Sequence, residues 1–433
     1  MELNKLIEFR QDIYDNALNK ARDAQFELVD ALLSDCRINS FPELSLAPVH
    51  QRQWHSSYAA LENGQQDEAW LRTYFCEQVP DLNVTVFALD STVWSHPGAR
   101  TLEGLRYAYS PTHSIKTSIV QGHPYSMLAW VPEVGRSWAL PVHNARITTA
   151  TDAVEMGVAQ VQWLSEQRAS GVGLDVVVGD GSYGNHRFLG GLADTNCAGL
   201  VRLRRDRILH SLAPTYSGRG RPAIHGPAFA FKDPSTWSEP AEMVELEDAH
   251  WGQVCLRRWD DLHAKQDAHT VFSVLCCEVH LERANPPQAL WLGYRAAPAQ
   301  DLELETLWRC FPWRWPIEPS FRFRKARLHW TVPQLQQTPR CDRWTMLLDM
   351  AYWMLYLGRK LVQDYRLPWQ KPLKILTPGR VLQNFQGLFP QIGTPTCQVK
   401  KRGKSPGWQT GRKRSPPPRF KTVKRGKKSS LKL

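Results

Sequence analysis

The amino-acid sequence predicts an α/β fold, and three observations carry this prediction. Two short apolar runs, VTVFALD at 84–90 and LDVVVGD at 174–180, have the length and the valine content of buried strands. Residues 150–167, which lie between them, have apolar side chains at helical spacing. This order of strand, helix and strand favours an α/β core in which at least some strands pair in parallel.

Further elements are expected on both sides of this core. Two more strands are predicted near 114–120 and 126–131. The Gly/Pro/Arg-rich stretch YSGRGRPAIHGP then opens a region with short strand-like runs at 253–258, 270–279 and 289–294, and helical patterns follow at 321–329 and 344–363. We therefore expect a β-rich insertion at 211–300 between two parts of the core, 81–210 and 301–365, and a C-terminal extension at 366–433.

The first 80 residues predict a helical N-terminal domain. Apolar side chains recur at helical spacing at Leu6, Phe9, Ile13, Ala17 and Ala21, and again at Trp70 and Tyr74. Dimerisation and recognition of DNA ends are both open as roles for this domain.

The positive charge of the chain lies at its end. The formal net charge is +12, and residues 400–433 hold 14 Lys or Arg and no acid, which leaves −2 for the rest. The Pro, Gly, Ser and Lys content predicts a disordered segment, and dense charge of one sign favours nucleic-acid binding over the alternative of a solvated solubility tail. The tail residues expected on DNA are Lys400, Lys401, Arg402, Arg412, Lys413 and Arg414.

The composition argues against other classes. The longest apolar stretch, 344–358, contains Asp349 and is shorter than the ~20 residues that cross a bilayer. No secretory signal is visible, so we expect a cytoplasmic protein without a membrane span. The nine cysteines show no C-x-x-C pair and no Cys/His spacing, so neither disulfides nor structural zinc is predicted. The irregularly spaced His96, His113, His123 and His143 are expected to be hydrogen-bonded or exposed.

Two carboxylates follow the two predicted core strands. Asp90 and Asp180 each stand at the carboxyl end of a strand, the edge where open α/β sheets place catalytic groups. If the strands are neighbours, the carboxylates converge, and like charges so close together favour a hard cation such as Mg²⁺. Taken singly, an Asp at such a position is more often a turn residue.

A third acid lies in FPWRWPIEPSFRFRK, where Phe311, Arg314, Glu318 and Lys325 have the spacing F-x2-R-x3-E-x6-K. Pro319 suits the first position of a helix, which would put Glu318 at the helix N-terminus, where the dipole favours a carboxylate. Arg322 and Lys325 would then share a face with Glu318. The alternative is an ordinary Glu/Arg pair on a solvated helix.

These three segments together resemble one known family. FALDST at Asp90, VVVGDGSYG at Asp180 and RWPIEPSFRFRK at Glu318, with the Lys-rich ending, resemble the DDE transposases of bacterial insertion sequences. The third segment looks like the Tyr, Arg, Glu, Lys signature of one transposase group, with Phe311 where Tyr is usual. The resemblance implies a ribonuclease-H-like core with a β-rich insertion.

The resemblance also implies the chemistry. Asp90 would bridge two Mg²⁺ (or Mn²⁺) ions, while Asp180 and Glu318 would each complete one coordination sphere. Arg314, Arg322 and Lys325 would hold the DNA backbone. Such a transposase joins its terminal inverted repeats to target DNA as a homodimer in the DNA complex, and we expect it to associate with the nucleoid.

Two alternatives stay open. A transposase derivative that binds DNA without cutting it would have the same overall sequence. GDGSYG at 179–184 also satisfies G-x-G-x-x-G after a strand, with Asp206 further on, which is the pattern of an NAD(P)-dependent oxidoreductase. Asp180 within that loop argues against this second alternative, because it would repel the pyrophosphate.

Overall fold

The computed structural model describes residues 2–109, 119–133, 137–280, 288–298, 300–399, 407, 410, 411, 413 and 415–423. The N-terminal elements are α1 (Glu2–Asp12), η1 (Ile13–Ala17), β1 (Leu18–Lys20), α2 (Arg22–Leu32), η2 (Phe41–Leu46), α3 (Trp54–Asn63), β2 (Gln65–Gln66) and α4 (Glu68–Glu77). The sheet core follows as β3 (Val84–Ser95), β4 (Arg106–Tyr109), β5 (Ile119–Trp130), β6 (Leu140–Arg146), α5 (Ala153–Gln167), β7 (Leu174–Gly179), α6 (His186–Gly191) and β8 (Cys197–Leu203).

The second half of the chain begins with strands and ends with helices. Its strand-rich part consists of β9 (Ile208–His210), β10 (Ala228–Ala230), η3 (Pro234–Thr236), β11 (Glu242–Asp248), β12 (Gly252–Ala264), β13 (Asp267–His280) and β14 (Leu290–Arg295). Its helical part consists of α7 (Leu304–Cys310), η4 (Phe311–Arg314), α8 (Ile317–Ala326), α9 (Thr338–Gly358), α10 (Pro378–Phe385), η5 (Gln386–Leu388) and α11 (Phe389–Ile392).

The core sheet has a ribonuclease-H-like strand order, β6-β5-β3-β7-β8. β3 pairs in parallel with β7, and β7 in parallel with β8, whereas β5 is antiparallel to both β3 and β6. This confirms the predicted α/β core with parallel pairing. The sequence predicted two strands where one long strand, β5, runs from 119 to 130, and residues 114–118 of the first lie outside the described part of the chain.

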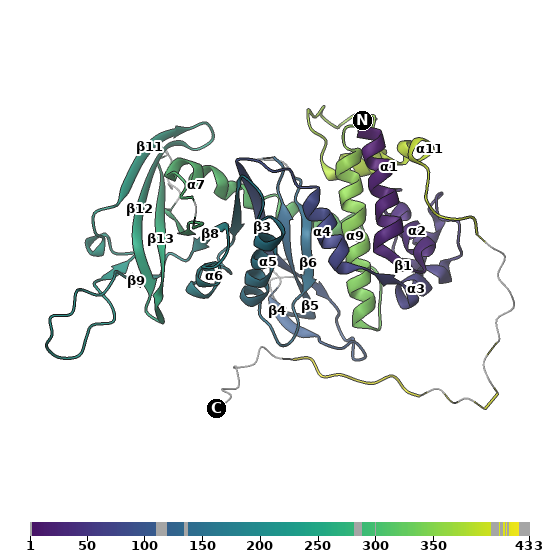
Figure 1. The fold of residues 1–433 in the computed structure, drawn as a ribbon. Coiled ribbons are helices and arrows are strands. Elements are labelled where there is room, and N and C mark those ends of the chain that lie inside the picture. The colour runs from purple at the N-terminus through teal and green to yellow at the C-terminus, as the bar shows by residue number, and fades with distance from the viewer. Residues whose placement is uncertain are drawn as a thin grey trace.

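Helices cover both faces of this sheet, as Figure 1 shows. In β3 the side chains alternate: Phe87 and Leu89 join the cluster that contains α5 and α6, while Val86 and Ala88 join the cluster that contains α7 and α8. A strand that is apolar on both sides suits a sheet covered on both faces. α5 starts where a reciprocal capping box forms, because Glu155 N donates to Asp152 Oδ1 at 2.9 Å and Asp152 N to Glu155 Oε2 at 3.1 Å.

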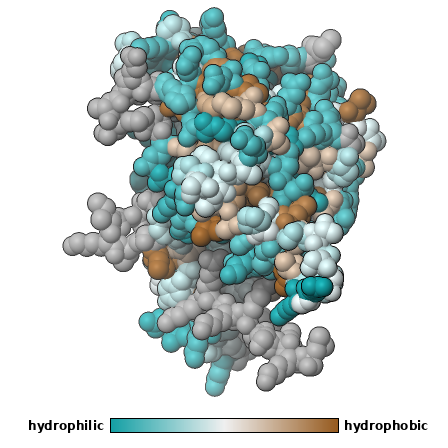
Figure 2. Space-filling model, turned by 90° about the vertical axis from the view of Figure 1, so that its left-hand side faces the viewer, coloured by the Kyte–Doolittle hydropathy of each residue, from teal (hydrophilic) through white to brown (hydrophobic). Residues whose placement is uncertain are grey.

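The β-rich segment extends the core sheet. β14 pairs antiparallel with β8, so β12, β13 and β14 continue the sheet beyond the core on the left in Figure 1. Figure 2 shows the molecule from this end, where the coloured surface is largely hydrophilic with scattered hydrophobic patches. Small scattered patches of this kind need no partner.

The N-terminal helices pack beside the long helix α9 near the end of the chain (Figure 1). The rings of Phe9 and Trp353 lie 6.3 Å apart, and the Arg10 guanidinium forms a buried ion pair with Asp30 at 2.7 Å. The helical N-terminus was predicted, but its packing on α9 joins residues some 340 positions apart in the sequence. Among the described residues, no helix has the length and apolar character to cross a bilayer.

Most of the basic tail lies outside the described residues. A described stretch, 415–423, reaches back to the core: Phe420 N donates to Arg100 O at 2.8 Å, and Val423 N donates to Leu105 O at 2.9 Å. The prediction of disorder for Lys400, Lys401, Arg402, Arg412 and Arg414 falls on residues that the structure does not describe.

A buried ion pair fastens α8 to α9. The Arg324 guanidinium donates to the Asp349 carboxylate, and their side chains are 0% and 5% exposed. Asn144 of β6 also donates to Asp349, at 3.2 Å. Because breaking a buried pair leaves an uncompensated charge, this contact should fix the position of α8.

Replacing Asp349 with Ala leaves the Arg324 guanidinium buried without its partner carboxylate. We expect Asp349→Ala to lower the free energy of unfolding by about 3–5 kcal/mol. Equilibrium unfolding in guanidinium chloride measures this loss. Asp206→Ala, which removes an exposed ion pair with Arg204, is the control and should change little. Equal effects of the two substitutions would contradict a structural role for the buried pair.

Candidate catalytic site

Asp90 and Asp180 lie side by side where the parallel pairing of β3 with β7 ends. The sequence predicted Asp90 at the carboxyl end of its strand, but β3 continues to Ser95 along β5, so Asp90 lies within the strand. In the register of β3 and β7, Leu89 is opposite Gly179, so the next residue of each chain segment is the acid. Both carboxylates accept local hydrogen bonds: Ser91 N donates to Asp90 Oδ1 at 2.7 Å, and Ser182 N donates to Asp180 Oδ1 at 2.8 Å. Strand pairing therefore brings together two acids that are 90 residues apart in the sequence.

Glu318 reaches the same edge from another element. It stands in the first turn of α8, and η4, which precedes α8, packs against both β3 and β7. Arg314 of η4 donates to Glu318 Oε1 at 2.7 Å. The helix begins at Ile317, two residues before the predicted start at Pro319, because Pro316 occupies the N-cap position. Glu318 still benefits from the helix dipole, as expected.

The charges of these acids act on one another. The pKa of Asp90 rises to about 7, first because the carboxyl is buried and then because of the negative charge of Asp180, with a smaller contribution from Glu318. The Ser91 N–H and the Arg314 guanidinium oppose this rise. Repelling carboxylate oxygens of this kind match the ligand preference of Mg²⁺ and Mn²⁺. The donor set therefore fits a divalent cation.

Tyr183 is a buried neighbour that the sequence did not single out. Its side chain is 0% exposed, and its hydroxyl has no hydrogen-bond partner among the described residues. Burial and the charges of Asp90 and Asp180 raise the pKa of this hydroxyl, so it stays protonated. Its place in GDGSYG, three residues after Asp180, was the available signal, but nothing in the pattern showed that the ring turns inward.

The predicted cations occupy different surroundings. Lys325 is partly buried, and its Nζ donates to Thr92 Oγ1 at 2.7 Å, two residues beyond Asp90 on β3. Burial lowers the pKa of Lys325. Arg322 is exposed, and so is Lys413 in the described part of the tail. The structure thus brings Arg314 to the acids and Lys325 to β3, and leaves Arg322 at the surface.

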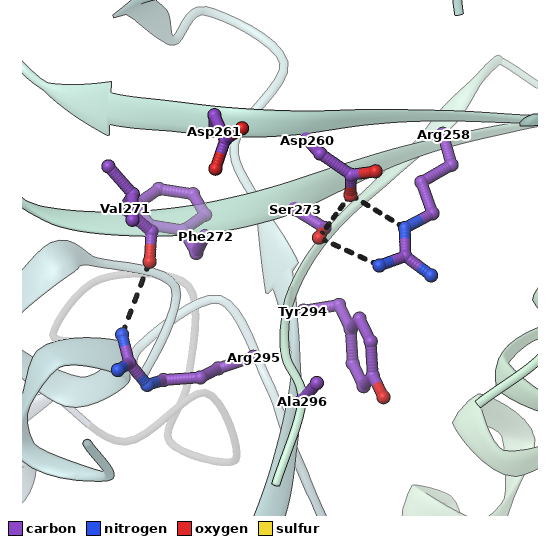
Figure 3. Close-up of a pocket in the computed structure, with 9 residues that line it drawn as sticks. All are labelled: Arg258, Asp260, Asp261, Val271, Phe272, Ser273, Tyr294, Arg295 and Ala296. Atoms are coloured by element: carbon purple, nitrogen blue, oxygen red, sulfur yellow. Dashed lines mark hydrogen bonds and ion pairs between the residues drawn. The ribbon is translucent and has the colours of Figure 1, made fainter. Parts of the chain in front are cut away.

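A pocket in the strand-rich segment contains none of these residues (Figure 3). It has a volume of about 280 Å³ and lies between β12, β13 and β14. Its polar side chains bond to one another, since Arg258 Nε donates to Asp260 at 2.7 Å and Ser273 also donates to Asp260. This hollow is therefore separate from the carboxylate site.

The expectation that these histidines are hydrogen-bonded or exposed holds for His123, whose Nε2 donates to Glu103 O at 2.8 Å, and is wrong for His96 and His143. His96, His123 and His143 are buried, and each has a ring nitrogen without a hydrogen-bond partner among the described residues. His113 lies outside that part of the chain. Turn-rich spacing suggested exposure, but tertiary packing of the flanking segments buries these rings.

The loop at 179–184 does not have the features of a dinucleotide site. A Cβ on Gly184 would lie 2.0 Å from the Arg202 carbonyl oxygen, so this glycine is required by close packing on β8. The Asp180 carboxylate already accepts the Ser182 N–H that a phosphate would need. The geometry therefore gives the nicotinamide alternative no support.

The fold and the site together define a transposase-like nuclease. Residues 14–264, more than half of the chain, match the family described as DDE superfamily endonuclease, and the chain belongs to that family. The matched range includes Asp90 and Asp180 and ends before Glu318. Members of this family act on DNA with divalent metal ions. A search of curated proteins finds no match to the chain.

The raised pKa of Asp90 predicts how stability depends on pH without metal. The folded protein holds a proton on Asp90 up to about pH 7, whereas the unfolded chain releases it near 3.8. Ionisation of Asp90 therefore opposes folding, and stability falls as pH rises between these values. From about pH 5 to about pH 8, we expect the unfolding midpoint of the wild type to fall about 2–4 °C further than that of Asp90→Asn.

Thermal unfolding in chelator measures this difference, and all other titrating groups are shared by the two proteins. Adding Mg²⁺ at the higher pH should raise the midpoint of the wild type more than that of Asp90→Asn. Parallel pH curves for the two proteins would contradict the assigned repulsion.

Proposed function

We propose that the protein is a DNA transposase of an insertion sequence, which cuts the ends of its element and joins them to target DNA. The observation that supports this proposal is that Asp90 and Asp180 follow register partners on β3 and β7, and that Glu318, in the first turn of α8, is near enough for its charge to raise the pKa of Asp90. The membership of the DDE superfamily supports it.

Each acid has a proposed role in holding metal. The charges of Asp180 and Glu318 both raise the pKa of Asp90, so Asp90 is near both of the other acids. Asp90 would therefore bridge two Mg²⁺ or Mn²⁺ ions, while Asp180 and Glu318 would each hold one. Such a pair of ions supplies an activated water or 3′-hydroxyl and stabilises the leaving oxygen of a phosphodiester. Glu318 would bind the metal while it still accepts a hydrogen bond from Arg314, because a carboxylate can accept from a guanidinium and bind a cation at once.

The basic residues around the site would position the DNA. Arg314 at the acids, Lys325 beside Thr92 and the exposed Arg322 lie on or near η4 and α8. Cations placed in this way contact phosphates and set the register of a duplex without reading its sequence. Phe311 stands where the signature group has Tyr, and it is partly buried against the face of the sheet that α7 covers. Phenylalanine has no hydroxyl, so this position contributes none to the proposed reaction.

The remaining proposals concern partners. The substrates would be the terminal inverted repeats of the element and a target duplex, and the active form would be a homodimer on paired ends in the nucleoid. The helical N-terminal region, 1–80, would serve end recognition or dimerisation, and the strand-rich insertion, 211–300, would divide the catalytic core. The segment 366–433 would add a basic DNA-binding tail.

Plasmid cleavage tests the catalytic proposal. A supercoiled plasmid that carries the element ends is incubated with Mg²⁺ or Mn²⁺ and with Asp90→Asn, Asp180→Asn or Glu318→Gln. We expect the cleavage rate of each variant to fall by more than the roughly 10–100-fold that is typical when a residue hydrogen-bonded to a metal ligand is removed. DNA binding should be kept.

Glu305→Gln is the matched control for Glu318→Gln. Glu305, in α7, is also a glutamate paired with an arginine four residues away, here Arg309 after it rather than before it, and it lies outside the site. The Glu305→Gln variant should cleave the plasmid at the rate of the wild type. Binding of the ends without cleavage by the wild type under either metal would favour a catalytically inactive derivative.

The tail should contribute to DNA binding at every sequence. Each phosphate contact that is lost should reduce the slope of log K against log salt by about 0.9, so neutralising six cations should lower the slope by up to about 5. The substitutions, all to Gln, are at Lys400, Lys401, Arg402, Arg412, Lys413 and Arg414. They leave residues 415–423 and their contacts with the core in place. Unchanged affinity for element ends and for random duplex at low and moderate salt would contradict this role.

A further inference from the structure

A second group of potential metal ligands lies away from the three acids. His96 follows β3, His123 is in β5, and Cys341 is in the first turn of α9. All three side chains are buried. One ligand atom from each residue lies within 4.8 Å of those of the other two, the only such trio of His, Cys, Asp or Glu found in the described part of the chain.

The spacing of these atoms is close to that of a bound ion. Zn–N bonds near 2.0 Å and Zn–S bonds near 2.3 Å put the ligands of a tetrahedral zinc about 3.3–3.6 Å apart. Atoms that already lie within 4.8 Å therefore need only small side-chain rotations to share one ion. Two of the three residues are already held together, because His96 N donates to Gln121 O of β5 at 2.8 Å and the rings of His96 and His123 lie 5.2 Å apart.

The hydrogen bonds of His123 prepare it as a ligand. Its Nε2 lies 2.8 Å from the carbonyl oxygen of Glu103, so Nε2 carries the hydrogen and donates it. The other nitrogen, Nδ1, then has a free lone pair, and it is buried without a hydrogen-bond partner. Histidines that bind metals commonly donate their second N–H to a backbone carbonyl in this way.

The same carbonyl oxygen links the site to α9. Glu103 O also accepts from Thr338 Oγ1, in the first turn of α9, at 2.7 Å. His96 resembles His123 in having a buried nitrogen, Nε2, with no partner. Two unpartnered nitrogens in one place are costly unless something binds them. A water molecule or a metal ion would satisfy both.

The two histidines are in the protonation state that binds metal, whereas the thiol of Cys341 must lose its proton. Burial lowers the pKa of His96 to about 3 and also lowers that of His123, so both imidazoles are neutral near pH 7 and their lone pairs are available. Burial raises the pKa of the Cys341 thiol to about 12. A metal would bind the thiolate, and one proton would be released to solvent for each ion bound.

We propose that His96, His123 and Cys341 bind one ion of the zinc class, which ties the strand pair β3–β5 to the start of α9. Nitrogen and thiolate ligands select Zn²⁺ over the Mg²⁺ that oxygen ligands prefer. The site is thus chemically distinct from Asp90, Asp180 and Glu318, and it stands whether or not the chain is a transposase. Its role is to hold the helical layer on the sheet.

Cobalt provides the first test, on the full-length wild type. The purified protein is stripped with chelator and titrated with Co²⁺, which reports both the geometry of its site and a thiolate ligand in its absorption spectrum. We expect a tetrahedral spectrum with a thiolate-to-cobalt charge-transfer band that saturates at about one ion per chain. Zn²⁺ should displace the Co²⁺ and bleach the spectrum.

Substitutions then assign the ligands. Cys341→Ser should abolish the charge-transfer band, and His123→Gln should weaken binding by at least about tenfold. His143→Gln is the matched control, because His143 is also a buried histidine with an unpartnered nitrogen but lies outside the trio. Asp180→Asn should leave the band unchanged, which separates this site from the carboxylates.

Zn²⁺ should also stabilise the fold. At a hundredfold excess over its Kd, it should raise the unfolding midpoint of the wild type by about 3 °C, and that of Cys341→Ser should rise less, because only the carboxylate site is left to bind the ion. The wild-type titration needs no variant, so the proposal stays testable if a substitution prevents folding. A wild type without a thiolate band at saturating Co²⁺ would overturn the proposal and leave a buried water as the partner of the two nitrogens.

Discussion

The parallel pairing of β3 with β7 is the constraint on which the site depends. It places Asp90 and Asp180 at the same level of one sheet edge, where burial and then the negative charge of Asp180 raise the pKa of Asp90 to about 7. A folded chain tolerates this repulsion most easily when a cation binds, because the cation restores the charged form of each acid. The strand register thus favours the binding of a divalent cation at this edge of the sheet.

The position of the third acid, Glu318, depends on helix packing rather than on strand pairing. Glu318 is carried by α8, which no strand register fixes, and the buried Arg324–Asp349 pair holds this helix to α9. α9 in turn packs on the N-terminal helices and on β6. The helical layer therefore holds α8 in place from the side opposite to the strand-rich segment, and the proposed His96–His123–Cys341 ion would add a further tie between this layer and the sheet.

The sequence predicted what local patterns encode. Apolar runs that end on Asp90 and Asp180 gave the two parallel strands, helical spacing gave α5, and the segment around Glu318 gave a helix that carries an acid near its N-terminus. Element ends were less accurate, as at Pro319, since Pro316 and Pro319 are both compatible with a first turn. The candidate acids were singled out because the three segments together resemble the DDE transposases, whereas each segment alone was compatible with a turn or a solvated helix.

The sequence could not predict the tertiary contacts between positions that are far apart in the chain. The packing of α1 on α9, the inward turn of Tyr183 and the approach of His96 and His123 to Cys341 all join distant positions without any local motif. Irregular spacing gave no sign that His96 and His123 lie together in the interior, and it led to the expectation of hydrogen-bonded or exposed rings. Contacts of this kind depend on the whole fold rather than on a window of residues.

Anomalous diffraction from crystals of the protein with DNA ends and Mn²⁺ would test the central claim most directly. The account predicts two manganese peaks about 3.5–4 Å apart, with Asp90 bound to both, Asp180 to one and Glu318 to the other. Manganese bound elsewhere, or a pair of ions that any of the three carboxylates fails to touch, would contradict it.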